Sequence, residues 1–196
     1  MIDVSTAILA GGAATRLGGI DKGLALLQGR PLIEWVIDAL PAECRQRLLI
    51  VANRNVEQYL AWAPTISDAQ SGFAGPLAGI AAALAYCTTP WLLTLPVDCP
   101  RPPAGFAERL LHEAGGGNHG PVVARDNCRR QPLFALYPRE LATSAKQALD
   151  IGLGVTRWQE SIGARVIDLS DLCGEWTNLN TAEDFAGFEG QLRVQA

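Results

Sequence analysis

Apolar runs of strand length alternate with helical patterns through the first half of the chain. Residues 6–10, 47–52 and 91–95 are short and apolar, a pattern typical of strands buried on both faces of a parallel sheet. Between them, residues 32–40 place apolar side chains on one helical face, and residues 77–86 form an alanine-rich helical stretch. Because strands alternate with helices, we predict an α/β fold: a single Rossmann-like, three-layer domain with a mostly parallel central sheet and helices on both faces.

The remaining pattern predicts shorter elements of both kinds. We expect further strands at 65–67, 121–124, 133–136 and 165–169, and helices at 56–62, 139–150 and 155–161. Residues 125–131 have the composition of a polar loop. Thr181, followed three residues later by Asp184, has the pattern of a capping box at the start of a last helix. Residues 190–196 are expected to fray.

Length and composition fit one cytoplasmic domain. The chain has 196 residues, 48% of them hydrophobic, so we predict a single domain over residues 1–196 with a substantial core. Its 16 basic and 20 acidic residues give a net charge of −4, which argues against a nucleic-acid binder. The five cysteines include no Cys-x-x-Cys pair, as expected of reduced cytosolic thiols. Without a basic leader or an apolar stretch near about 20 residues, we expect a cytoplasmic protein that does not bind membranes.

Candidate chemistry is concentrated in a glycine-rich stretch, AILAGGAATRLGGIDK, at residues 7–22. Gly11 and Gly12 follow the first apolar run, allow a positive φ and leave no Cβ between backbone N–H groups and an anion. Arg16 and Lys22 supply positive charge for a polyphosphate. The spacing excludes both a Walker A loop and a dinucleotide fingerprint. The pattern therefore favours a phosphate-binding loop of another kind.

Polar residues also follow three of the predicted strands. Asp98 lies between two prolines after the strand at 91–95, and it is a candidate Mg²⁺ ligand. Mg²⁺ in nucleotide sites takes one or two carboxylates together with phosphate oxygens. Asn53 and Asp68 end two other strands, which places them at the same sheet edge as Gly11. Each could instead be an ordinary turn residue, but their convergence on one edge favours a binding site.

These motifs resemble the molybdenum cofactor guanylyltransferase family. Its signature is Leu-Ala-Gly-Gly, three variable residues, Arg-Leu-Gly-Gly, one variable residue and Asp-Lys-Gly, which runs here over residues 9–23. The resemblance implies a fold of the nucleotide-diphospho-sugar transferase type and the transfer of GMP from GTP to molybdopterin, with Mg²⁺ and release of pyrophosphate. It assigns Arg16 and Lys22 to catalysis and the metal to Asp98. It assigns GTP binding to Leu9, Ala10, Gly11, Gly12, Lys22, Asn53, Asp68 and Asp98.

Two later segments resemble the family's region for the second substrate. Arg129 and Arg130 in one, and Asn178 and Asn180 in the other, are implied to bind the pterin. Ala182 stands where the family usually has a proline, which puts only the stiffness of that loop in doubt. The resemblance also implies molybdenum-insertion proteins and molybdoenzyme chaperones as partners, and we expect a monomer or weak oligomer.

Other functions stay open on the sequence alone. A molybdopterin cytidylyltransferase usually has Leu-Ala-Ala-Gly in the first loop, so Gly11, which leaves room for a larger base, favours guanine. A sugar-phosphate nucleotidyltransferase is a second alternative, and a nucleotide- or cofactor-binding protein without catalysis is a third. The presence of both Lys22 and Asp98 argues against the third. Cys99, with no histidine near it in the sequence, is not expected to act as a nucleophile.

Overall fold

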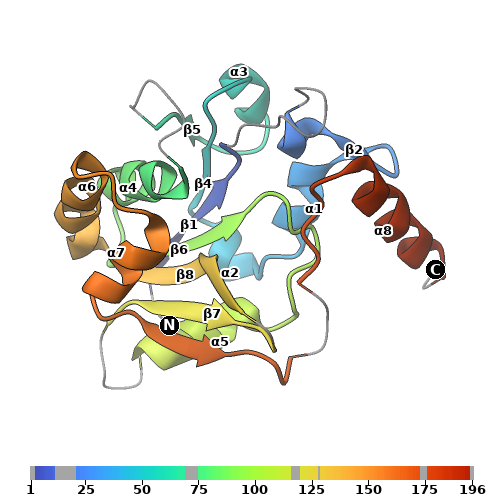
Figure 1. Cartoon of the computed structure of the whole chain (residues 1–196). Coiled ribbons are helices and arrows are strands. Elements are labelled where there is room, and N and C mark those ends of the chain that lie inside the picture. Colours follow the sequence, from blue (N-terminus) through green and yellow to red (C-terminus); the bar gives the residue numbers. More distant parts are fainter. Residues whose placement is uncertain are drawn as a thin grey trace.

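The computed structural model describes residues 3–11, 21–68, 75–115, 120–127, 129–172 and 176–194. Its centre is a seven-stranded sheet in the order β5-β4-β1-β6-β8-β7-β9, and β2 and β3 form a separate two-stranded sheet (Figure 1). The strands are β1 (Val4–Leu9), β2 (Leu26–Leu27), β3 (Arg30–Pro31), β4 (Leu48–Val51), β5 (Thr65–Ile66), β6 (Trp91–Pro96), β7 (Val122–Arg125), β8 (Arg130–Pro138) and β9 (Arg165–Asp168).

The sheet is mostly parallel, as predicted. β1 pairs in parallel with β4 and β6, β4 with β5, and β7 with β9. β8 is the exception, because it runs antiparallel to both β6 and β7. It begins at Arg130, which pairs with Arg125 at the end of β7. The polar loop expected over residues 125–131 is therefore too long, since the ladder between β7 and β8 incorporates both of its ends.

Helices cover both faces of the sheet and give the predicted three layers (Figure 1). α1, α2 and α5 contribute to the core on one face, and α4, α6 and α7 to the core on the other. The helices are α1 (Leu32–Asp38), α2 (Ala42–Arg45), α3 (Val56–Tyr59), α4 (Pro76–Tyr86), α5 (Phe106–Gly115), α6 (Ala142–Asp150), α7 (Val155–Ser161) and α8 (Ala182–Val194), with 3-10 turns η2 (Lys22–Leu24) and η3 (Arg139–Leu141).

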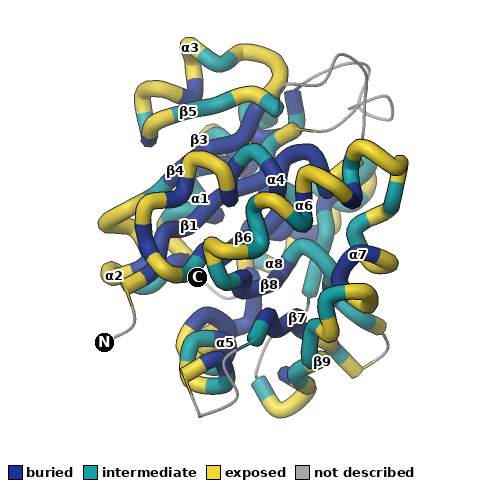
Figure 2. The backbone as a smooth tube through the Cα atoms, turned by 90° about the vertical axis from the view of Figure 1, so that its left-hand side faces the viewer, coloured by how far each residue is buried: buried dark blue, intermediate teal, exposed yellow. Residues whose placement is uncertain are grey.

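The central strand β1 supplies both cores. Successive side chains of a strand point to opposite faces, so Val4 and Ile8 pack with α1 and α5, whereas Ala7 and Leu9 pack with α4. Every residue of β1 is buried. Figure 2 shows the same contrast across the molecule, with dark blue strands inside and exposed, yellow stretches along the helices outside them. The continuous apolar run at 6–10 is thus explained by burial on both sides.

Small residues bring the start of α4 close to the sheet. The helix begins at Pro76, after Gly75 with a φ of 76°, a conformation that favours glycine. A Cβ at Gly79 would lie 3.4 Å from Leu9 Cδ2, so the helix approaches β1 with little room to spare. This packing places the first turn of α4 beside the carboxyl ends of β1 and β4.

α8 lies against α1 and the β2–β3 hairpin rather than on the main sheet (Figure 1). Phe188 of α8 and Leu179 before it pack with Leu27 and Leu32 in a small third core. The helix runs as far as Val194, so positions 190–194, which we expected to fray, are helical. None of the described helices has the length and apolar composition needed to cross a bilayer.

Candidate active site

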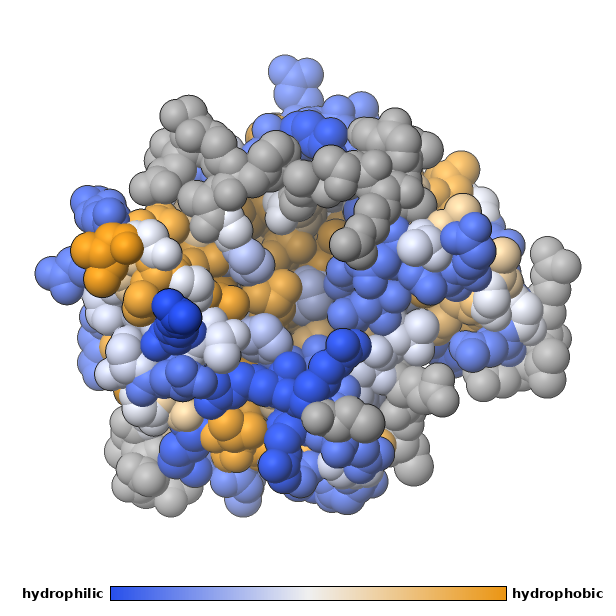
Figure 3. Space-filling model, viewed as in Figure 1, coloured by the Kyte–Doolittle hydropathy of each residue, from blue (hydrophilic) through white to orange (hydrophobic). Residues whose placement is uncertain are grey.

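The carboxyl ends of β1, β4 and β6 open into one cavity. Neighbouring parallel strands end at the same edge, which is where open α/β sheets bind their ligands. Figure 3 shows a hollow near the centre of this face, with apolar surface inside it and hydrophilic side chains around it. The cavity is lined by Leu9, Ala10, Gly11, Lys22, Val51, Asp68, Gly75, Pro76, Gly79, Pro96, Val97, Asp98 and Leu133. Six residues predicted to bind or act on GTP therefore line a single cavity: Leu9, Ala10, Gly11, Lys22, Asp68 and Asp98.

Asn53 does not line this cavity, but it lies against Gly11 and Asp68, which do. Asn53 Oδ1 accepts a hydrogen bond of 3.0 Å from the backbone N–H of Asp68. A Cβ at Gly11 would lie 3.6 Å from Asn53 Nδ2, which is an ordinary contact distance. Gly11 does not adopt the positive φ that a glycine would allow. What glycine provides here is the absence of a methyl group on the cavity wall, and the backbone conformation does not require it.

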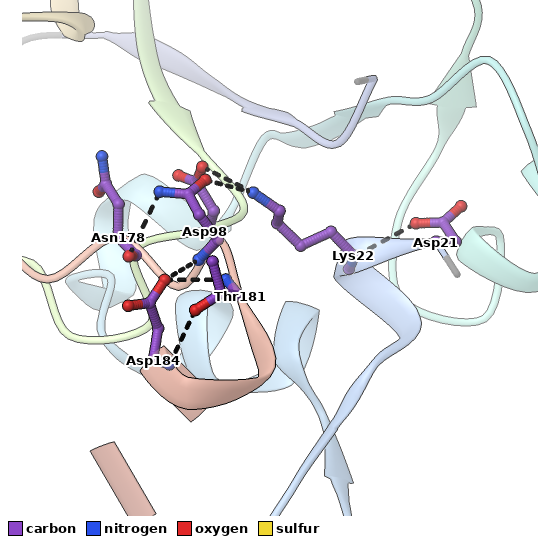
Figure 4. Close-up of polar contacts among 8 residues, drawn as sticks. Asp21, Lys22, Asp98, Asn178, Thr181 and Asp184 are labelled. Atoms are coloured by element: carbon purple, nitrogen blue, oxygen red, sulfur yellow. Dashed lines mark hydrogen bonds and ion pairs between the residues drawn. The ribbon is translucent and has the colours of Figure 1, made fainter. Parts of the chain in front are cut away.

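Lys22 and Asp98, which both line the cavity, face each other (Figure 4). Lys22 Nζ lies 3.2 Å from Asp98 Oδ2 and donates a second hydrogen bond of 2.8 Å to Asn180 Oδ1. Both charged side chains are about one-fifth exposed, at 20% and 23%. A part-buried ammonium beside a carboxylate can exchange partners when a phosphate enters, because the ion pair is accessible from the cavity.

Asp98 has an oxygen that fits a cation. Its Oδ1 is buried and has no hydrogen-bond partner among the described residues. The described residues contain no group of three or more His, Cys, Asp or Glu side chains that could hold a metal on its own. A site with one carboxylate suits Mg²⁺ only when substrate phosphate oxygens complete its coordination. The donor set is therefore that of a metal bound together with a nucleotide.

The segment before α8 is anchored beside Asp98. The backbone N–H of Leu179 donates to the backbone oxygen of Asp98 at 2.8 Å. Asp184 Oδ2 accepts from the N–H groups of Asn180 and Thr181 at 2.7 and 2.8 Å, and Thr181 Oγ1 accepts from the N–H of Asp184, which confirms the predicted capping box (Figure 4). These backbone donors, with a smaller contribution from the charge of Lys22, lower the pKa of Asp184 below its ordinary value.

Aromatic packing fixes the other end of the same segment. Trp176 lies edge-on against Phe134 of β8, with ring centroids 4.5 Å apart, and Phe134 in turn packs edge-on against Phe106 of α5 at 5.5 Å. The segment 176–181 is thus tied to the sheet by rings and to Asp98 by its backbone. Its asparagines do not line the cavity, but Asn180 contacts Lys22, which does, and Asn178 contacts Asn180.

Several predicted site residues lie elsewhere. Arg130 of β8 pairs with Glu160 of α7 at 3.3 Å, and the backbone N–H of Arg129 donates to Asp126 Oδ1 at 2.7 Å. From this part of β8 it is Leu133, not either arginine, that lines the cavity. Gly12 and Arg16 lie outside the described residues.

The sequence reasoning missed the surroundings of Asp21. The structure shows this residue buried beside Tyr59 and Asn55, whose side chains both donate to its carboxylate. Nothing in the sequence indicates a role for Tyr59 at the site, because an aromatic residue in a short amphipathic helix is typical of core packing. The contact of Lys22 with Asn180 was also not foreseen.

Cys99 is unsuited to nucleophilic catalysis, as expected. The side chain is fully buried next to Asp98. Burial, with the neighbouring carboxylate, raises the pKa of the thiol to about 12, which keeps it protonated at neutral pH.

Comparison with known proteins places this geometry in a family. The model of the MobA-like NTP transferase domain matches residues 6–165. The chain is 40% identical over 184 residues to the molybdenum cofactor guanylyltransferase of Shewanella sediminis, covering 93% of each chain. It is 41% identical over 181 residues to that of Pseudomonas paraeruginosa, covering 91% of each.

A solved structure agrees with the fold. The molybdopterin-guanine dinucleotide biosynthesis protein A of Archaeoglobus fulgidus superposes with a TM-score of 0.78 at 23% identity, over 97% of this chain and 99% of that one. Three observations support the same assignment: the strand order of the sheet, the cavity at its carboxyl edge and the relatives that align along almost the whole chain. The chain belongs to the MobA-like NTP transferases and, within them, to the molybdenum cofactor guanylyltransferase family.

Proposed function

We propose that this protein transfers GMP from GTP to molybdopterin, forming the guanine dinucleotide form of the cofactor and pyrophosphate. An oxygen of the molybdopterin phosphate attacks the α-phosphorus of GTP. The bond from that phosphorus to the bridging oxygen breaks, and the electron pair leaves with pyrophosphate. The protein has little covalent chemistry to perform, so its contribution is to align the two substrates and to neutralise charge.

The side of the cavity formed by Gly11, Asn53 and Asp68 suits a guanine base. Guanine carries N–H donors on one edge, and Asp68 Oδ1 is a buried oxygen without a hydrogen-bond partner among the described residues. Asn53 is held beside Asp68 by the hydrogen bond to its backbone N–H. The absence of a side chain at Gly11 leaves space for the larger purine ring system. A buried unpaired acceptor discriminates strongly, because a base without the matching donor leaves it desolvated.

Lys22 and Asp98 form the side of the cavity that we assign to the phosphates. In the absence of a nucleotide, the ammonium of Lys22 is paired with Asp98 and Asn180. A triphosphate offers it a stronger anionic partner, and the ammonium then opposes the charge that develops on the leaving pyrophosphate. Asp98 Oδ1 would hold Mg²⁺, which supplies charge neutralisation and alignment of the triphosphate when it is bound.

Asn178 and Asn180 belong to the side on which the pterin would enter. Both lie in the segment anchored to Asp98 by Leu179, and Asn178 Oδ1 is buried without a hydrogen-bond partner among the described residues. An amide oxygen in this position can accept from the N–H groups of a pterin ring. Arg129 and Arg130 remain predicted contacts of the pterin phosphate.

The observation that carries the proposal is the pairing of Lys22 with Asp98 in a cavity that is also lined by Leu9, Ala10 and Gly11 of the family's signature. The test measures pyrophosphate release with molybdopterin, Mg²⁺ and each of GTP, CTP, ATP and UTP. We expect release with GTP. Release with CTP and not GTP would make the protein a cytidylyltransferase, whereas tight GTP binding without release from any nucleotide would indicate a binding protein.

A further inference from the structure

Asp21 is a buried carboxylate whose oxygens are both engaged inside the protein. Only 8% of the residue is exposed, although it directly precedes Lys22. Its Oδ1 accepts hydrogen bonds from the backbone N–H of Gly23 at 3.2 Å and from the hydroxyl of Tyr59 at 2.5 Å. Its Oδ2 accepts from Asn55 Nδ2 at 3.0 Å. A carboxylate committed to three protein donors is not arranged to receive a base or a sugar.

Two of these donors lie more than thirty residues further along the chain: Asn55 directly precedes α3, and Tyr59 is the last residue of this helix. Asn55 precedes the helix in a left-handed conformation, with φ at 51° and ψ at 31°. Tyr59 is fully buried in the core between α3 and the sheet. Burial, together with the hydrogen bond to Asp21, raises the pKa of Tyr59 above its ordinary value, so the phenol remains protonated and donates.

The fit around this hydroxyl is close enough to require a glycine. A Cβ at Gly23 would lie 2.3 Å from Tyr59 Oη and 3.1 Å from both Tyr59 Cζ and Val97 Cγ2. The first of these distances is impossible for real atoms, so no larger residue is accommodated without a shift of the ring. Tyr59, Asp21 and Gly23 therefore form one fitted contact between α3 and the turn η2.

Both neighbours of Lys22 in the chain, Asp21 and Gly23, take part in this contact. Lys22 lies between them at the start of η2, and Asp21 is the residue that caps this turn. Lysine has a long flexible side chain, so the direction in which its ammonium points depends on how firmly its backbone is held. Here the backbone is fixed on both sides, and the ammonium reaches Asp98 and Asn180.

We propose that Tyr59 and Asn55 are positioning residues that, by holding Asp21, orient the Lys22 ammonium toward the triphosphate. This inference rests on the role proposed above for Lys22. The proposal gives α3 a function beyond packing. The residues that directly follow Asn53 in the chain would hold the backbone of Lys22 and so orient its ammonium. Neither positioning residue is among those that line the cavity.

The test variant is Tyr59→Phe, which keeps the ring that packs beside Trp62, with centroids 6.1 Å apart, and removes only the hydroxyl. We expect GTP to bind about tenfold more weakly, as loss of a hydrogen bond to a charged group predicts. The inhibition constant of guanosine, which has no phosphates, should not change. A general loosening of the site would weaken both ligands alike, and that result would overturn the proposal.

Tyr137→Phe is the matched control. Tyr137 is also fully buried, and its hydroxyl accepts from Gln159 Nε2 at 2.6 Å, in the core on the other side of the sheet. Its loss should leave GTP affinity unchanged. Asn55→Gly provides a second test that does not disturb the core, because glycine tolerates the left-handed conformation and lacks the amide. It should weaken GTP several-fold without affecting guanosine, and an unchanged GTP affinity in both Asn55→Gly and Tyr59→Phe would refute the proposal.

A double-variant cycle separates this inference from the role of Lys22 itself. If Tyr59 acts through Lys22, adding Tyr59→Phe to Lys22→Met should cause no further loss of GTP affinity. Additive losses would refute the positioning role while leaving the proposed function intact. Normal GTP affinity in Lys22→Met alone would instead remove Lys22 from the phosphate site, whatever Tyr59 does.

Discussion

Lys22 donates a 2.8 Å hydrogen bond to the side-chain oxygen of Asn180, 158 positions later in the chain. The same ammonium lies 3.2 Å from Asp98. One cation thus links three segments that are far apart in the sequence: the turn η2, the residues that follow β6 and the approach to α8. The predictions below follow from this arrangement and from the cavity beside it.

Replacing Asp98 should abolish activity without unfolding the protein. Asp98→Asn keeps the shape of the side chain but removes the charge that would hold Mg²⁺, so we expect kcat to fall by about a hundredfold or more. Wild-type activity should disappear with a chelator and return with added Mg²⁺. Asp171→Asn, at an exposed ion pair with Arg109, is the control. Full turnover in Asp98→Asn would exclude the metal role.

Removing the ammonium of Lys22 should weaken the interaction with the triphosphate. Lys22→Met keeps the aliphatic stem, and we expect kcat/KM for GTP to fall by about two orders of magnitude. Lys146→Met, at an exposed ion pair with Asp150, should have no effect. Thermal unfolding of both variants shows whether the change is confined to the site. An unchanged kcat/KM for GTP in Lys22→Met would contradict this assignment.

A methyl group at Gly11 should alter the choice of base rather than the fold. The nearest atom to a Cβ there is Asn53 Nδ2 at 3.6 Å, so the protein itself accommodates alanine. The methyl group would occupy space that we assign to guanine. We expect Gly11→Ala to lower the preference for GTP over CTP by about tenfold, the typical effect of one methyl group in a pocket. Measured kcat/KM ratios with both nucleotides check this, and an unchanged ratio would remove Gly11 from base selection.

Acid should loosen the segment that carries Asn180. Hydrogen bonds from Asn180 and Thr181 hold the pKa of Asp184 below its ordinary value of 3.8. A carboxyl group whose pKa is depressed in the folded state stabilises the protein above its unfolded pKa, and this stabilisation is lost as the pH falls through the folded pKa. Asp184→Asn should therefore lower the melting temperature at about pH 7 and have progressively less effect below about pH 4. A difference from wild type that is the same at every pH would contradict this account.

The buried cysteines should resist alkylation in the folded protein. Burial raises the pKa of Cys44 to about 11 and that of Cys99 to about 12, so neither thiol is ionised at about pH 8. Peptide mass spectrometry after iodoacetamide treatment should find both unmodified until denaturant is added. Cys99→Ala should keep its turnover, because no step of the proposed transfer uses the thiol.

Sequence patterns correctly predicted the elements whose side chains alternate regularly between buried and exposed positions or are buried throughout. β1 lies between two cores, so its run of apolar residues correctly predicted a strand buried on both faces. The direction of β8 could not be foreseen, because alternation within a strand says nothing of its partner's direction. Its start at Arg130 was missed for a related reason, since a charged residue at the end of a hairpin resembles loop sequence.

The candidate site divides in the same way. Gly11, Asp68 and Asp98 could be grouped in advance because parallel strands bring their carboxyl ends together. Tyr59 could not, because its importance depends on a hydroxyl that meets Asp21 across the fold. Arg130 contacts Glu160 in this structure, and its contact with the pterin phosphate stays a prediction because the motif alone does not fix where a basic side chain points.

Because the segment before α8 is anchored to Asp98, the arrangement around Lys22 depends on the last part of the chain. The strands of the main sheet are complete once residue 168 has been made, and a nascent chain of that length already contains Lys22 and Asp98. It still lacks Leu179, which bonds to the backbone of Asp98, and Asn180, which receives the lysine. The sheet can therefore form without the last segment, whereas the arrangement around Lys22 is complete only when the segment leading into α8 has docked.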